Sequence, residues 1–146
     1  MHFVTGGAYN GKSKWVKEYY ELRHTPHLWI SGYEEGYIED PSLAEHKENI
    51  VVLEAAEVWF KQWLKRLNKE EVRSKWRMVL QARLEWEKKE EGRKAIIIGT
   101  DMTKGIVPIT AEERIWRDVT GWAYQDTVKE SERVDVIWYG INQQLK

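Results

Sequence analysis

One segment near the N-terminus constrains this chain more than any other: Gly6-Gly7-Ala8-Tyr9-Asn10-Gly11-Lys12-Ser13. It has the glycine, lysine and serine spacing of a phosphate-binding loop. The apolar run from His2 to Thr5 predicts a strand before it, and an apolar stripe from Trp15 to Leu22 predicts a helix after it. A phosphate-binding loop requires this strand–loop–helix context, so the segment predicts a nucleotide-binding site rather than a chance match.

The residue types of this loop match the chemistry of a triphosphate. Glycines let backbone N–H groups approach phosphate oxygens, and the first turn of the following helix adds unpaired N–H groups at its positive dipole end. We expect Lys12 to reach the β- and γ-phosphates and the Ser13 hydroxyl to complete a Mg²⁺ shell. The predicted substrate is therefore GTP or ATP, with Mg²⁺ as the cofactor.

Apolar periodicity predicts strands that alternate with helices along the rest of the chain. The expected strands are His2–Thr5, His27–Ser31, Asn49–Glu54, Ala95–Gly99 and Val134–Tyr139, and the expected helices are 15–22, 55–67, 68–91 and 111–131. This alternation predicts an α/β fold in which a mostly parallel sheet of about five strands carries helices on both faces. The length of 146 residues predicts a single domain over 1–146.

Composition and charge exclude several classes of protein. The chain has no cysteine, which excludes disulfides and thiolate metal sites, and no apolar run long enough to span a membrane. The net charge is −1, so a nucleic-acid partner is not expected, although residues 61–83 are basic and 34–57 acidic. We read both stretches as solvated surfaces, with a patch for an anionic partner as the alternative. The expected location is the cytoplasm.

Two carboxylates follow buried strands and are candidates for the chemistry near Mg²⁺. Glu54 ends the strand from Ile50, and Asp101 comes shortly after the strand that contains Ile96–Ile98. Ligands gather at the carboxyl ends of strands in open α/β sheets. We expect Glu54 to support the metal or to act as general base, with Asp101 as the second choice. The alternative for either residue is to cap the next helix.

The second half of the chain carries a more specific pattern: Gly105-Ile106-Val107-Pro108, then Arg114, Arg117-Asp118, Gly121 and Gln125. With the phosphate loop, this order resembles the cobinamide kinase / cobinamide-phosphate guanylyltransferase family, CobU. The resemblance implies a RecA-like P-loop fold, a trimer, and a corrinoid substrate, adenosylcobinamide. Such enzymes phosphorylate the aminopropanol hydroxyl of that substrate and then transfer GMP from GTP through a histidine-linked intermediate.

The middle of the chain is shorter than this family's pattern. His46 is the histidine available as guanylyl acceptor, but neither Arg nor Trp follows it before Asn49. The alternative is a surface histidine. Ser31 and Tyr33 are candidates to line a base or substrate. Arg114 and Arg117 are candidates for phosphate positioning, or for pairing with carboxylates or a neighbouring subunit.

The sequence thus predicts an adenosylcobinamide kinase whose guanylyl transfer depends on His46. Two rivals remain: a nucleotide-binding partner protein without activity, and a P-loop kinase for another small molecule. We expect His2, His24 and His27 to be structural or solvated, and the pair Trp59 and Trp63 to belong to the core or to an interface.

Overall fold

The computed structural model describes residues 1–34, 46–103 and 105–146, and it has a six-stranded sheet at its centre. The strands are β1 (His2–Gly6), β2 (His27–Ser31), β3 (Ile50–Glu54), β4 (Lys94–Thr100), β5 (Arg133–Trp138) and β6 (Ile141–Gln144). Their spatial order is β2-β3-β4-β1-β5-β6, in which the first five are parallel and β6 is antiparallel. The predicted α/β class, with its mostly parallel sheet, is confirmed.

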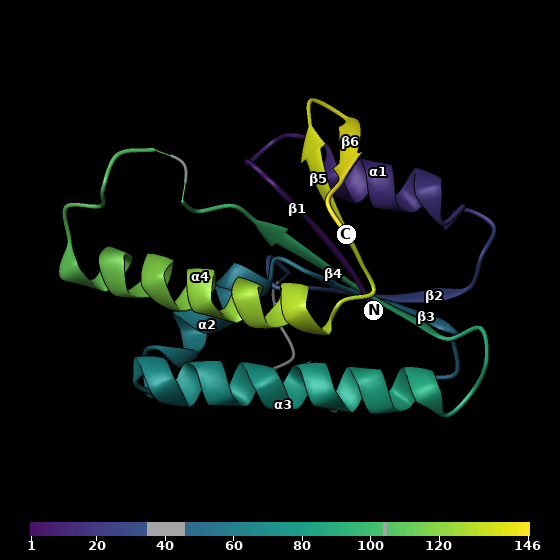
Figure 1. Ribbon diagram of the computed structural model, residues 1–146, viewed down its shortest axis with the longest axis horizontal. Coiled ribbons are helices and arrows are strands. Elements are labelled where there is room, and N and C mark those ends of the chain that lie inside the picture. The colour runs from purple at the N-terminus through teal and green to yellow at the C-terminus, as the bar shows by residue number, and fades with distance from the viewer. Residues whose placement is uncertain (35–45, 104) are drawn as a thin grey trace.

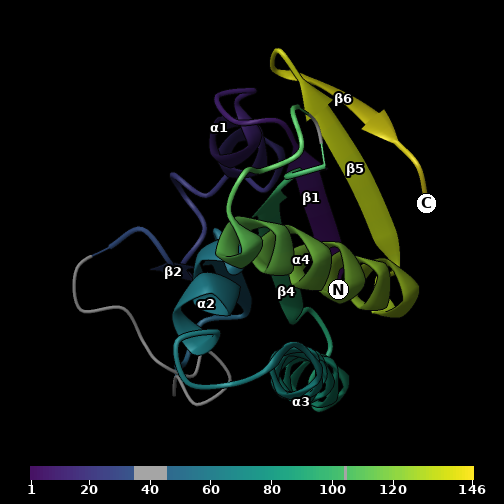
Figure 2. The same ribbon diagram turned by 90° about the vertical axis from the view of Figure 1, so that its left-hand side faces the viewer.

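Helices cover both faces of this sheet, as expected. They are α1 (Lys12–Tyr19), α2 (Ala56–Trp63), α3 (Lys69–Lys88) and α4 (Ala111–Glu130). Figures 1 and 2 show α1 on one face and the other three helices on the opposite face. A capping box opens α3: Asn68 accepts from the Glu71 N–H at 2.9 Å, and Glu71 accepts from the Asn68 N–H at 2.8 Å.

Two cores form because successive residues of a strand point to opposite faces. On β1, Phe3 packs among α2, α3 and α4, whereas Val4 packs beneath α1. Trp59 and Trp63 are 0% and 4% exposed, and both belong to the larger core. Of the two readings offered for this pair, the structure therefore favours the core.

The sixth strand is a difference from the expected sheet. All four residues of β6 are exposed and Ile141 is the one strongly apolar side chain, so the strand has no hydrophobic alternation to reveal it. The turn between β5 and β6 has positive φ at both Tyr139 (50°) and Gly140 (80°). That conformation suits a tight two-residue hairpin.

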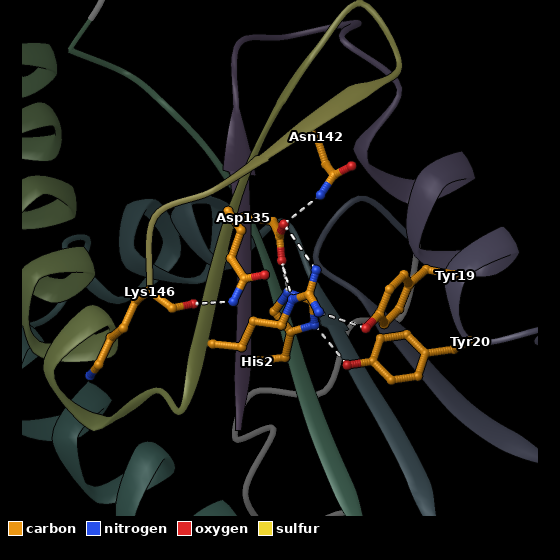
Figure 3. A network of polar contacts seen from close by, with 8 residues as sticks. His2, Tyr19, Tyr20, Asp135, Asn142 and Lys146 are labelled. Carbon is orange, nitrogen blue, oxygen red and sulfur yellow. Dashed lines mark hydrogen bonds and ion pairs between the residues drawn. The ribbon is translucent and has the colours of Figure 1, made fainter.

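A buried polar network joins β1, β5, β6 and α1 (Figure 3). His2 donates from Nε2 to Asp135 at 2.8 Å and accepts at Nδ1 from the Tyr20 hydroxyl at 2.7 Å. Asp135 also accepts from Arg133 at 2.6 Å and from Asn142 at 2.8 Å. Because Arg133 already balances the charge of Asp135, His2 remains neutral, and burial lowers its pKa to about 4. This buried position agrees with the prediction that His2 is a structural residue.

Candidate functional site

The phosphate loop connects β1 to α1 and requires glycine at both ends. At Gly6 (φ 144°) a Cβ atom would overlap the carbonyl oxygen of Ile137 on β5, and Gly11 has φ 86°. Side chains are strongly disfavoured in both conformations. The predicted strand–loop–helix context is therefore present, and the loop opens at the carboxyl edge of the sheet.

The β5–β6 hairpin holds this loop from the side. The N–H of Gly140 donates to the Asn10 carbonyl at 2.9 Å, and the N–H of Tyr139 donates to the Asn10 side chain at 3.0 Å. Asn10, expected from the sequence to contact a nucleotide, thus has a structural function in the loop. Tyr9, its neighbour, has φ 59° and a fully exposed ring.

Lys12 lies in the first turn of α1 and points back into the loop. Its Nζ donates to the Gly7 carbonyl at 2.8 Å. Burial lowers the pKa of Lys12, and the negative charges of Glu57, Glu54 and Asp101 oppose that effect. A cation held among carboxylates at the entrance of a phosphate loop is suited to binding phosphate oxygens.

Ser13 and Glu54 meet across the site. The Ser13 hydroxyl donates to Oε1 of Glu54 in a short hydrogen bond, and the Trp29 indole N–H donates to Oε2 at 2.9 Å. Strand pairing places Trp29 opposite Val52, two residues before Glu54, so the indole and the carboxylate lie diagonally on the same face of the sheet. A hydroxyl and a carboxylate are the hard oxygen ligands that Mg²⁺ prefers, so these residues fit the predicted metal.

Glu57, one turn after Glu54 in sequence, was not singled out by the sequence analysis. Its side chain is 3% exposed and accepts three hydrogen bonds, from the Tyr33 hydroxyl (3.0 Å), the Thr100 N–H (3.0 Å) and the Tyr124 hydroxyl (2.7 Å). Its position in the first turn of α2 favours negative charge through the helix dipole. The spacing Glu-x-x-Glu after a buried strand was the signal available in the sequence.

These groups surround one cavity of about 580 Å³ at the carboxyl edge of the sheet. The described residues that line it come from the phosphate loop, from the ends of β3 and β4, and from the segment after β2: Ala8, Tyr9, Gly11, Lys12, Ser13, Lys14, Tyr33, Glu54, Ala55, Ile98 and Thr100. The volume is within the range of small-molecule sites. The structure therefore brings Lys12, Ser13 and Glu54 together as the sequence predicts.

The remaining candidates after β2 and β4 differ in position. Tyr33 lines the cavity, whereas Ser31 is buried and its hydroxyl accepts from the Tyr33 N–H at 3.3 Å. Asp101 lies beside the loop, where its N–H donates to the Gly6 carbonyl at 2.9 Å. Its carboxylate accepts from the N–H and hydroxyl of Thr103 at 2.8 and 2.6 Å, which orders the segment that follows β4.

The two arginines of α4 are occupied by local contacts. Arg114 donates to the carbonyl oxygens of Pro108 and Ile109 at 3.1 and 2.8 Å, and Arg117 lies 3.8 Å from Asp118. Neither arginine is among the described residues that line the cavity. The structure thus supports the interpretation that Arg117 pairs with a carboxylate. Arg114 instead holds the loop that precedes α4.

His46 does not join the cavity. It precedes β3, at the amino edge of the sheet, where its ring packs 4.8 Å from that of Trp86 and its Nε2 lies 3.3 Å from Arg83. The length of β3 alone places about 13 Å between that edge and Glu54, at 3.3 Å per residue. Burial against α3 lowers the pKa of His46. The geometry separates this predicted guanylyl acceptor from the phosphate loop.

A comparison with protein families agrees with the features of this fold. Among the described ranges, no helix is both long and apolar enough to cross a membrane. None of the curated proteins compared with the chain matches it. The family described as cobinamide kinase / cobinamide phosphate guanyltransferase, CobU, matches residues 26–145, a stretch that starts after the phosphate loop and so supports the assignment independently of it. The chain belongs to this family of P-loop NTPase-like enzymes, which act in cobalamin biosynthesis.

Proposed function

We propose that this protein transfers the γ-phosphoryl group of a nucleoside triphosphate to the aminopropanol hydroxyl of adenosylcobinamide. The observation that carries the proposal is the meeting of Lys12, Ser13 and Glu54 in one cavity behind a glycine-bounded loop. The family supplies the substrate classes, a nucleotide and a cobinamide. The cavity supplies the charge and positioning that phosphoryl transfer requires.

Each of these side chains has a function in this reaction. Lys12 exchanges its contact with the Gly7 carbonyl for phosphate oxygens, and its positive charge stabilises the charge that develops on them. Ser13 and Glu54 would hold Mg²⁺, which would neutralise part of the negative charge of the phosphate oxygens. The backbone N–H groups of the loop orient the triphosphate.

The position of His46 favours the kinase step over guanylyl transfer. A histidine that accepts GMP must reach the α-phosphorus of a bound GTP, and here the imidazole packs on Trp86 at the other edge of the sheet. A phosphoryl transfer needs no covalent enzyme intermediate, so it is compatible with a cavity whose described lining does not include His46.

The test uses GTP and ATP labelled in the γ- or the α-phosphate, with Mg²⁺ and adenosylcobinamide. We expect the γ-label to appear on the corrinoid and no α-label to remain on the protein. If the label moves to a different acceptor in a panel of nucleosides and corrinoids, the protein is another small-molecule kinase. Tight nucleotide binding with no transfer to any acceptor would contradict the enzymatic proposal and support the partner protein.

A further inference from the structure

Two carboxylates, Glu54 and Glu57, stand near Lys12, and their hydrogen bonds differ in a way that separates their functions. Both oxygens of Glu54 are engaged, one by Ser13 on the metal side of the cavity and the other by the Trp29 indole. Glu57 is buried below the cavity and makes no contact with Ser13 or Trp29 among the described interactions. Glu54 therefore faces the cavity directly, whereas Glu57 is not among the described residues that line it.

The three donors to Glu57 are not equivalent. Thr100 offers a backbone N–H, which keeps its proton, and the Tyr124 hydroxyl lies against Gly99, where a Cβ atom would overlap it. Tyr33 lines the cavity and is 65% exposed, yet its hydroxyl donates inward to Oε1 of Glu57 at 3.0 Å. Among these donors, Tyr33 connects the buried carboxylate with the space that a substrate enters.

We propose that Tyr33 and Glu57 form a proton relay that removes the proton of the acceptor hydroxyl during phosphoryl transfer. This inference rests on the proposed kinase function and deepens it, because it assigns the general base that the reaction needs. Glu54 then remains with the metal, and Glu57 receives the proton. Tyr33 acts as the group between substrate and base.

The acceptor oxygen forms a bond to the γ-phosphorus, and the bond from that phosphorus to the β,γ-bridging oxygen breaks, with its electron pair leaving on the nucleoside diphosphate. The acceptor proton passes to the Tyr33 oxygen while the Tyr33 proton passes to Oε1 of Glu57. After product release, the proton returns through Tyr33 to water.

The ionisation of Tyr33 suits a relay rather than a base. Burial and the neighbouring charge of Glu57 raise the pKa of Tyr33 to about 12, so the phenol stays protonated at neutral pH. A protonated phenol accepts a proton only in step with the loss of its own. Oε1 of Glu57 is the atom that accepts the Tyr33 hydroxyl proton in a hydrogen bond, so Glu57 is the group placed to take this proton.

Two tyrosines on one carboxylate provide a matched test. Tyr33→Phe and Tyr124→Phe each delete one hydroxyl bonded to Glu57, but only the first interrupts the path from the cavity. General-base catalysis contributes 10²–10⁴-fold, so we expect Tyr33→Phe to lower kcat by roughly 10²-fold. We expect Tyr124→Phe to lower kcat by about fivefold at most, because the path from the cavity through Tyr33 to Glu57 stays intact. Nucleotide Kd and acceptor KM should stay within about twofold in Tyr33→Phe, since uniform binding is unchanged.

Glu57→Gln extends the test to the terminal base, with thermal unfolding as the check that the variant folds. Transfer of the γ-label to adenosylcobinamide is measured in parallel with hydrolysis of the triphosphate, because attacking water loses a proton through the same relay. A wild type that hydrolyses the triphosphate but does not phosphorylate the corrinoid contradicts the proposed acceptor. The effect of each variant on the relay is then measured from the rate of hydrolysis. Equal losses in the two tyrosine variants, or an unchanged kcat in Tyr33→Phe, overturn the relay. A wild type with neither activity overturns both proposals.

Discussion

Trp29 donates its indole N–H to the oxygen of Glu54 that Ser13 does not use, at 2.9 Å. Trp29 lies opposite Val52 in the parallel pair β2–β3 and is therefore a diagonal neighbour of Glu54 on the same face of the sheet, where its indole orients the carboxylate. A metal-binding carboxylate whose second oxygen is held in this way cannot rotate freely. The relationship makes Trp29 a positioning residue for the proposed Mg²⁺ site, although nothing in its own sequence context marks it as one.

Replacing Trp29 with Phe is therefore expected to lower the affinity of the site for Mg²⁺. The substitution removes the N–H but keeps an aromatic ring beneath Lys17, which lies 4.7 Å from the Trp29 ring. Loss of such an outer hydrogen bond reduces metal affinity about tenfold. The measurement is the Mg²⁺ concentration that half-saturates γ-label transfer. Trp138→Phe, at an exposed tryptophan outside the cavity lining, is the control. Equal Mg²⁺ dependence in both variants would remove Trp29 from the site.

Lys12→Met should weaken nucleotide binding without unfolding the protein. The Lys12 ammonium lies near Glu54, Glu57 and Asp101, and its removal takes away a positive charge that opposes these carboxylates and attracts a triphosphate. Loss of a charged hydrogen bond of about 2–3 kcal/mol corresponds to roughly a hundredfold in Kd. Titration calorimetry with GTP and with ATP measures the loss.

The control for this substitution is Lys65→Met, because Lys65 is exposed just after α2 and is not among the described lining residues. Its nucleotide affinity should match that of the wild type. Retained affinity in Lys12→Met would mean that phosphate binding depends on the backbone N–H groups alone.

The phosphate loop and its edge of the sheet could be predicted because their determinants are local. A glycine pattern, a strand and a helix lie within the first 22 residues, and Glu54 directly follows a continuous apolar strand. Parallel strands place their carboxyl ends at one edge, so local information was sufficient to bring Ser13 and Glu54 together.

Glu57 could not be predicted in the same way. Its neighbours come from three distant segments, at Tyr33, Thr100 and Tyr124, and no spacing rule joins them. Apart from the spacing Glu-x-x-Glu, the sequence showed a carboxylate in an acidic stretch, which is typical of solvated surface. The assembled sheet turns that residue inward. For His46 the opposite holds, because a resemblance suggested a site residue that the structure places at the other edge of the sheet.

His46→Ala is expected to leave phosphoryl transfer unchanged. The ring packs against Trp86 and beside Arg83 on α3, so its removal should cost about 1 kcal/mol of stability, as for one aromatic pair. Urea unfolding measures that cost, and γ-label transfer measures activity. An α-label from GTP that attaches to the wild type and is lost in His46→Ala would contradict this prediction and establish guanylyl transfer through His46.

The network around His2 predicts that stability falls as the solution is acidified from pH 7. The pKa of His2 is about 4 in the folded protein and 6.5 in the unfolded chain, so the unfolded state binds the extra proton between those values. The stabilisation from a neutral His2 is complete above pH 6.5 and is lost as the pH falls toward 4. Within that window the free energy of unfolding should change by up to about 1.4 kcal/mol per pH unit from this group.

Urea unfolding of the wild type and of His2→Asn at pH 7, 6 and 5 tests the assignment. The variant is less stable at pH 7, because Asp135 and Tyr20 lose the bonds at 2.8 and 2.7 Å that join them to His2. Its stability should nevertheless depend less on pH, since one buried titrating group is gone. His24→Asn is the control, as His24 is exposed, and it should retain the wild-type pH dependence. If His2→Asn keeps the same slope as the wild type, the acid sensitivity belongs to another group, and the neutral state assigned to His2 is wrong.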